Sequence, residues 1–193
     1  MTMVAWQRTD QRHGLSIARR EPLADGWLFH GSEILVGTEV GQETVSCTFR
    51  VVVGPDWATR QVEVLSVSAV GEVRRDLEAS QGRWTVDGAP RLDLEGCVDV
   101  DIAATPLTNT FPIRRLADLG VGESVTSAVA WVDVPALSVV RVDQTYERLP
   151  DRDGTACWRY RDATYGAFVL TVDDEGLVLD YEGFASRIRT VSG

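Results

Sequence analysis

Acidic and apolar side chains alternate between residues 92 and 102, and the acidic ones are the first candidates for chemistry. Residues two apart on a strand point to the same side of a sheet, so Asp99 and Asp101 would lie together. Two neighbouring carboxylates could share a cation, or one could raise the pKa of the other and form an acid–base pair. The alternative is a solvated strand face, where acidic side chains usually lie. That alternative is favoured for Asp93 and Glu95, and both interpretations stay open for Asp99 and Asp101.

A segment dense in hydroxyl, amide and guanidinium groups follows directly, over residues 103–116. Its candidates for ligand contact are Thr108, Asn109, Arg114 and Arg115. Such groups, with the preceding aspartates, could bind sugar hydroxyls and a phosphate through directional and charge-assisted hydrogen bonds. They could equally satisfy backbone groups of a well-capped loop. Both interpretations remain open at the level of the sequence.

Three further candidates lie outside this segment. Arg60 stands at the start of a predicted strand, where it could contact a ligand, although pairing with a protein acid is favoured. Gln144 lies on the same predicted strand face as Val142 and Tyr146, which is otherwise apolar. A polar side chain there needs a partner, either in the protein or in a ligand. We therefore add Arg60, Gln144 and Tyr146 to the ligand-binding candidates.

The familiar catalytic signatures are missing from the sequence. It contains no Gly-x-Ser-x-Gly elbow, phosphate-binding loop, Gly-x-Gly-x-x-Gly or Cys-x-x-Cys motif, and no histidine pair at metal-ligand spacing. It also contains no lysine, which excludes Schiff-base chemistry by this chain. Of the two histidines, His30 lies between aromatic residues and is interpreted as structural. The catalytic residues, if there are any, stay unknown at the level of the sequence. We predict no metal and no cofactor, and the sequence favours binding over catalysis.

Length and charge narrow the class of protein. The 193 residues are predicted to form a single β domain over 1–193, and the net charge of −10 argues against nucleic-acid binding. The sequence shows no signal peptide and no apolar run of transmembrane length. Three widely spaced cysteines indicate free thiols in a reducing compartment. We therefore expect a cytoplasmic protein without a transmembrane segment, and its oligomeric state stays open.

A period of two dominates the chain and predicts strands. Clear examples are 45–53 and 92–102, while 62–67 changes phase and suggests a bulge. The turn 173–176 predicts a hairpin, and Pro112–Leu119 is the best helix candidate. We predict a mainly β fold: a strongly curved antiparallel sheet, as a half-barrel or spiral β-roll, with few short helices. Such a sheet could enclose an apolar cavity or be filled by its own side chains.

The central motif carries a resemblance to a known family. Residues 96–102 and 105–116, Gly-Cys-Val-Asp-Val-Asp-Ile and Thr-Pro-Leu-Thr-Asn-Thr-Phe-Pro-Ile-Arg-Arg-Leu, resemble the hallmark of the putative glycolipid-binding family, formerly a domain of unknown function. Shorter segments resemble the family in the same order: residues 25–33, 56–60, 82–84, 144–146 and 173–187. One departure is Glu182, where the family would have proline after the tyrosine. The resemblance implies a curved β-rich fold, similar to bacterial lipoprotein carriers that cradle acyl chains.

Three functions follow as hypotheses. The first is a protein that binds an amphiphilic lipid or glycolipid in the concavity of the sheet, its polar head held by the candidates named above. The second is a hydrolase-like enzyme of glycolipid or small glycosylated-molecule metabolism that uses Asp99 and Asp101 as acid and base. The third is a structural or interaction protein, which a cluster of exposed tryptophans would favour.

Overall fold

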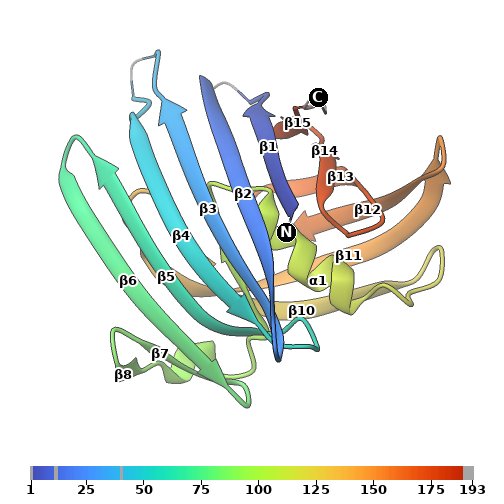
Figure 1. The fold of residues 1–193 in the computed structure, drawn as a ribbon, viewed down its shortest axis with the longest axis horizontal. Coiled ribbons are helices and arrows are strands. Elements are labelled where there is room, and N and C mark those ends of the chain that lie inside the picture. Colours follow the sequence, from blue (N-terminus) through green and yellow to red (C-terminus); the bar gives the residue numbers. More distant parts are fainter. Residues whose placement is uncertain (1, 11–12, 40, 189–193) are drawn as a thin grey trace.

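The computed structural model describes residues 2–10, 13–39 and 41–188, and nearly all of its regular structure belongs to one sheet of fifteen strands (Figure 1). The strands of the first part are β1 (Thr2–Arg8), β2 (His13–Leu23), β3 (Gly26–Val36), β4 (Val45–Val53), β5 (Thr59–Ser68), β6 (Gly71–Ser80), β7 (Arg83–Val86) and β8 (Ala89–Pro90). The strands of the second part are β9 (Asp99–Ile102), β10 (Ser124–Val132), β11 (Val139–Arg152), β12 (Thr155–Asp162), β13 (Gly166–Val172), β14 (Val178–Tyr181) and β15 (Ala185–Arg187). The helical elements are η1 (Leu92–Leu94), η2 (Leu107–Asn109) and α1 (Thr110–Arg115).

The order of strands divides the sheet into two halves joined at β1. One half runs from β1 through β2, β3, β4, β5, β6 and β7 to β8, and the other from β15 through β14, β13, β12, β11 and β10 to β9. Neighbours pair antiparallel throughout, except for the parallel pair of β9 with β10. The prediction of a mainly β fold with an antiparallel sheet and few short helices is confirmed. Within the described residues, no helix has the length and apolar character needed to cross a membrane.

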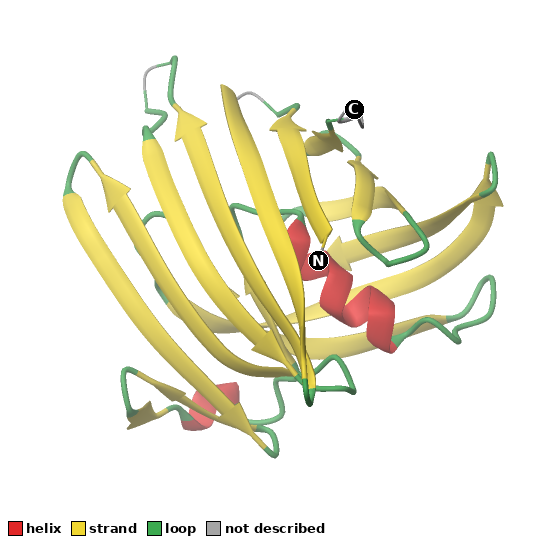
Figure 2. Ribbon diagram, in the orientation of Figure 1, coloured by secondary structure: helices red, strands yellow, loops and turns green. Residues whose placement is uncertain are grey.

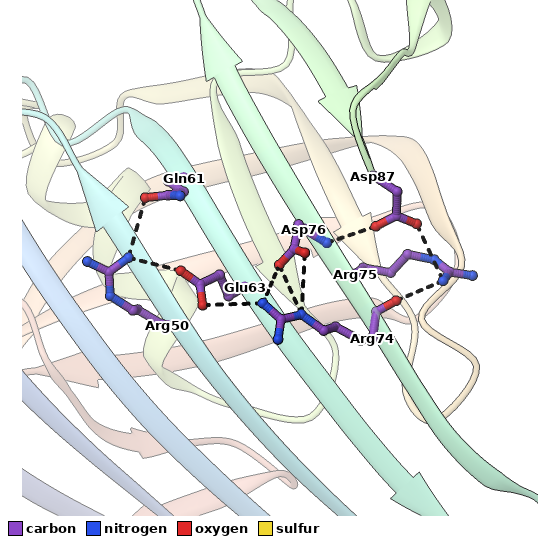
Figure 3. A network of polar contacts seen from close by, with 7 residues as sticks. All are labelled: Arg50, Gln61, Glu63, Arg74, Arg75, Asp76 and Asp87. Carbon is purple, nitrogen blue, oxygen red and sulfur yellow. Dashed lines mark hydrogen bonds and ion pairs between the residues drawn. The ribbon is translucent and has the colours of Figure 1, made fainter.

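The inner face of the first half is apolar. On β4, Cys47, Phe49, Val51 and Val53 are buried, as the alternation of 45–53 predicts. The opposite, outer face carries a row of polar contacts across β4, β5, β6 and the start of the β7–β8 turn (Figure 3). Its strand residues are Arg50, Gln61, Glu63, Arg74 and Asp76, and Figure 3 also draws Asp87 of the turn and Arg75, which lies opposite the inner-face residue Val64. Exposed ion pairs of this kind contribute little to stability, and the buried apolar face therefore carries most of it.

Residues 103–116, which include η2 and α1, lie between the two halves of the sheet (Figures 1 and 2). Phe111 is fully buried, and its ring centroid lies 5.1 Å from that of Phe29 on β3. Ile113 belongs to a second apolar cluster, with Tyr146 and Trp158 of the other half. The chain therefore fills much of the interior between the two halves with its own side chains.

Two predicted elements have different bounds in the structure. The helix predicted at 112–119 begins at Thr110 and ends at Arg115, so that Pro112 lies inside its first turn, where backbone N–H groups have no helical partner. The strand predicted at 92–102 is wrong over its first part. There the backbone of Leu94 donates to Arg91 in the turn of η1, and Gly96 at φ +81° redirects the chain before β9 begins.

The bulge predicted within 62–67 is also absent. Val62, Val64 and Ser66 are buried in one unbroken alternation, while Leu65 and Val67 lie on the outer face. The apparent change of phase arises because the polar Ser66 is buried and the apolar Val67 is exposed. The irregular pairing of β4 with β5 lies earlier, between Val52 and Val53. The hairpin predicted at 173–176 is confirmed, with the backbone of Gly176 donating to Asp173 between β13 and β14.

Candidate functional site

A pocket of about 340 Å³ opens on the inner face of the second half of the sheet. It lies between β12, β13 and β14 on one side and residues 101–105 on the other, with the end of β1 beside it. Six aromatic side chains line it: Trp131, Tyr160, Tyr165, Phe168, Tyr181 and Phe184. Its charged lining residues are Arg8, Asp10, Asp101, Asp133 and Asp162. The volume is at the lower end of the range for small-molecule pockets.

The aromatic wall follows from the pairing of strands. Tyr160 on β12 lies opposite Phe168 on β13, and the centroids of their stacked rings are 6.4 Å apart. Tyr181 on β14 meets both of these rings edge-on, at 6.2 and 5.7 Å. Phe184, in the turn after β14, lies 4.8 Å from Tyr181. Alternate positions on neighbouring strands thus create one continuous apolar surface, of the kind that packs against the C–H face of a ring.

A chain of side-chain hydrogen bonds runs along the polar side of the pocket. The amide nitrogen of Gln144 donates to Asp101 at 2.6 Å and to the Tyr160 hydroxyl at 3.0 Å. The Tyr160 hydroxyl in turn donates to Asp162 at 2.5 Å. Gln144 is buried and is not itself part of the lining. Its role is to fix Asp101 and Tyr160, which do face the pocket.

The two aspartates at the ends of this chain differ. Burial raises the pKa of Asp101, against the hydrogen bonds from Gln144 and Thr108, which lower it. Asp162 accepts backbone hydrogen bonds from Thr164 and Tyr165 through its other oxygen, which fixes the β12–β13 turn. Burial thus disfavours the charged form of Asp101, the carboxylate that Gln144 and Thr108 hold in place.

A buried arginine and a buried glutamate lie behind the pocket. Arg8 donates to the backbone oxygen of Ala104 at 3.0 Å, pairs with Asp10 at 2.5 Å and lies 3.9 Å above the Phe184 ring. Glu33 on β3 is fully buried and accepts a hydrogen bond from the Ser16 hydroxyl at 2.6 Å. Burial raises the pKa of Glu33 to about 8, although Ser16, Thr105 and Arg8 oppose the rise. Glu33 is thus neutral over much of the physiological pH range.

The structure separates the two aspartates singled out in the sequence. Arg115 holds both oxygens of the buried Asp99, at 2.5 and 2.6 Å. Burial raises the pKa of Asp99, and the Arg115 guanidinium opposes that rise. Asp101 instead faces the pocket and accepts a hydrogen bond from Thr108 at 2.8 Å. Asp99 therefore anchors α1 to β9, while Asp101 is available to a ligand.

The other predicted candidates fall into two groups. Asn109 lines the pocket and accepts a hydrogen bond from the Tyr146 hydroxyl at 2.8 Å, so both lie close to Asp101 and Gln144. Arg60 and Arg114 lie elsewhere. Arg60 is exposed and pairs with Asp25 at 2.6 Å, and Arg114 lies 5.1 Å above the Trp57 ring. The structure thus brings together Asp101, Thr108, Asn109, Gln144 and Tyr146, with Asp99 and Arg115 on the adjoining strand and helix.

Sequence reasoning missed most of the aromatic wall and Glu33. The signal was present, because Tyr160 and Asp162 follow Trp158 at a spacing of two, and Glu33 stands between Phe29 and Leu35 on one strand face. A polar residue on an otherwise apolar face is the same argument that singled out Gln144. No group of three or more His, Cys, Asp or Glu residues in the described part of the chain is arranged to hold a metal ion.

Comparisons with known proteins agree on one family. The sequence pattern of the family described as Putative glycolipid-binding matches residues 3–187. A solved structure of a DUF1089 family protein from Pseudomonas aeruginosa is 29% identical, with a TM-score of 0.76 over 90% of this chain and 92% of that one. A β-barrel-like DUF1849 protein from Brucella abortus, 13% identical with a TM-score of 0.53 over 97% and 94% of the two chains, shares the fold alone. No protein among the curated ones matches this chain.

Proposed function

Because this chain belongs to the Putative glycolipid-binding family, we propose that it binds the sugar head group of an amphiphilic ligand in the pocket lined by Asp101 and Tyr181. The single observation that carries the proposal is the combination of a continuous aromatic wall with fixed carboxylates in one pocket. Carboxylates accept hydrogen bonds from hydroxyl groups in defined directions, and aromatic rings pack on the apolar faces of sugars.

The charge of the lining favours a neutral sugar over a phosphate. Four aspartates line the pocket against one arginine, and that arginine is already paired with Asp10. An anionic head would meet carboxylates with no free guanidinium to offset them. Arg60 and Arg114, the residues considered for an anion in the sequence, lie outside this lining. The proposed ligand is therefore an uncharged glycoside with an apolar tail.

The proposal includes the shape of the sheet around the pocket. We propose a half-barrel or spiral β-roll, in which the β9 edge turns inward. Alternate residues of β9 support this arrangement, because Val100 and Ile102 join the core cluster that contains Phe49 and Val62, while Asp99 and Asp101 face the other way. The ligand would then lie on the concave side, in the part that residues 103–116 leave open.

Titration calorimetry with a neutral alkyl glycoside, and with an alkyl phosphate of the same chain length, tests this function. We expect saturable binding of the glycoside and at least tenfold weaker binding of the phosphate. The variant Asp101→Asn should weaken glycoside binding about tenfold or more, the usual cost of a lost charged partner. The control Asp93→Asn changes an exposed carboxylate outside the pocket and should bind as the wild type. Absence of glycoside binding, or equal loss in both variants, would refute the proposal.

A hydrolase is the second candidate, and one observation favours it: the raised pKa of Asp101 in an open pocket. Its predicted partner Asp99 is held on both oxygens by Arg115, so the pair Asp99–Asp101 does not supply an acid and a base together. Any acid–base chemistry would therefore rest on Asp101 with Asp162. Turnover of a chromogenic glycoside that Asp101→Asn abolishes would favour the enzyme over the binding protein.

A further inference from the structure

A shallow apolar groove adjoins the pocket. It measures about 90 Å³ and shares Trp131, Tyr160, Asp162 and Tyr165 with the pocket lining. Beyond these shared residues its walls are Val140 and Val142 on β11 and Thr164 in the β12–β13 turn. Pocket and groove therefore adjoin along these four shared residues, where the rings of Trp131 and Tyr165 pack 6.1 Å apart, and the lining is polar toward Asp101 and apolar toward Val140.

Strand register explains why this groove is apolar and open. Trp131 on β10 lies opposite Val140 on β11, and Val142 follows on the same face, two residues before Gln144. This is the inner face of the sheet, the side on which residues 103–116 fill the interior further along. Val140 nevertheless keeps 43% of its surface exposed, and Tyr165 keeps 59%. The filling segment thus ends short of this edge and leaves apolar inner-face residues in contact with water.

We propose that the groove binds the first carbons of a single alkyl chain attached to the sugar that the pocket holds. This inference rests on the proposed function and extends it to the apolar part of the ligand. Because the two depressions share four lining residues, a ligand that occupies both would change from polar to apolar over a short distance. The small size of the groove restricts it to one chain, so a single-chain glycoside fits and the two tails of a diacyl lipid do not.

The groove residues differ from the exposed apolar residues of the outer face in their position relative to the pocket. Val67 on β5 is 42% exposed, almost as much as Val140, but it lies on the outer face, away from any residue of the pocket. Its side chain can contact neither the head group nor a chain that extends from it. The two valines therefore form a matched pair, alike in residue type, strand context and exposure, that differ in their position relative to the pocket.

The experiment compares affinities of methyl, butyl and octyl glycosides with one sugar, by calorimetry, for the wild type and for Val140→Asp and Val67→Asp. A buried methylene contributes about 0.8 kcal/mol, or roughly fourfold in affinity. We expect the wild type to bind more tightly from methyl to butyl and to gain little more at octyl, where the chain outgrows the groove. Val140→Asp should lose most of that gain and keep the affinity for methyl glycoside, and Val67→Asp should behave as the wild type.

Each other outcome overturns the inference in a recognisable way. Equal affinity for all three glycosides in the wild type would remove the alkyl site and leave the sugar site standing, whereas no binding of any glycoside would remove both. Loss of the gain in both variants would assign it to a general effect of an added carboxylate on the protein and not to the groove. If Val140→Asp does not fold, Val140→Thr replaces it, with Val67→Thr as its control. A dimer in sedimentation velocity that Val140→Asp dissociates would show that a second copy covers the groove.

Discussion

The inner faces of the two halves of the sheet are covered by other residues to different extents. In the half from β1 to β6 the inner face is closed, because Leu107 and Phe111 pack into the cluster that contains Phe29 and Phe49. In the half from β10 to β14 the same side carries a pocket, a chain of hydrogen bonds and exposed valine and tyrosine side chains. Several elements cover the first half, because Val100 and Ile102 of β9 join Leu107 and Phe111 in that cluster, whereas residues 103–116 cover the second half only in part.

This difference shows how one segment can pack into the core of one half and line the pocket of the other. Arg115 and Phe111 fasten the segment to β9 and β3, while Asn109 from the same segment lines the pocket and Thr108 donates a hydrogen bond to Asp101. Curvature alone would leave apolar room along the whole inner face. The chain fills most of that room itself, and only the remainder is open to a ligand. Predictions that separate stability from binding therefore test the account.

The largest effect is expected in the closed half. Phe111→Ala removes a fully buried ring of the segment that packs on Phe29 of β3. This variant should lower the free energy of unfolding by about 3–5 kcal/mol. Glycoside affinity of the folded fraction should stay within about twofold, because Phe111 does not line the pocket. Urea denaturation measures the loss, and Leu92→Ala, at an 82% exposed site, is the control that should change little. A strong loss of glycoside binding in Phe111→Ala would show that packing in the first half supports the binding site in the second half.

The next effect is a pH dependence from Glu33, which lies where the closed half meets the pocket. Its pKa is about 8 in the folded protein against an ordinary 4.5, so the folded state binds more protons than the unfolded state between these values. Stability therefore falls as the pH rises from about 4.5 to 8, by on the order of 4 kcal/mol from this group. Arg8 and Cys47 are the titratable groups that interact with it.

Glu33→Gln should remove this dependence, because the amide stays neutral at every pH. Denaturation of both proteins at pH 5 and at pH 8.5 measures the effect, with the variant losing less stability than the wild type between the two. Parallel pH profiles for the two proteins would contradict an uncharged Glu33 in the folded state.

A smaller stability effect, with a clear binding effect, is expected in the open half. Phe168→Ala removes a partly exposed ring of the aromatic wall, stacked on Tyr160. Stability should fall by about 1 kcal/mol, while glycoside affinity should fall about tenfold or more. Fluorescence titration of the six tryptophans, which include Trp131 in the pocket, follows the binding. Unchanged affinity would mean that the wall does not touch the ligand.

The smallest effect is expected at Arg60, outside both regions. It is exposed and paired with Asp25, and exposed ion pairs of this kind contribute little to stability. Arg60→Ala should therefore change both the midpoint of denaturation and the glycoside affinity very little. A clear loss of affinity would place part of the ligand on the surface near β5.

Alternation along single strands was enough to predict much of the fold. The inner face of β4 and the β13–β14 hairpin follow directly from residues 45–53 and 173–176. The failures at 62–67 and 92–102 have two causes. Apolarity along a strand does not reveal which side is covered, and alternation of apolar and acidic residues does not exclude a turn. Val67 is exposed and Ser66 buried because of what packs across the sheet, and Leu92 lies in a turn set by Gly96.

The candidate site was predictable in part for a similar reason. Gln144 was found because a polar group on an apolar face needs a partner, and its partners are Asp101 and Tyr160. Asp99 and Asp101 looked equivalent by spacing, and only the helix that brings Arg115 to Asp99 distinguishes them. The aromatic wall required the register of the β12–β13 and β13–β14 pairs, which the positions of the turns alone do not give. The roles of all nine candidates in ligand binding stay predictions.

The most direct measurement of the central claim is a map of amide chemical shifts during titration of the protein with a neutral butyl glycoside. We predict saturable changes at residues 101–105, at Trp131, at 160–168 and at 181–184, with β4 to β6 unchanged. Changes confined to the inner face of β2 to β6, or to the outer face of the sheet, would contradict the assignment of binding to the half that residues 103–116 leave open.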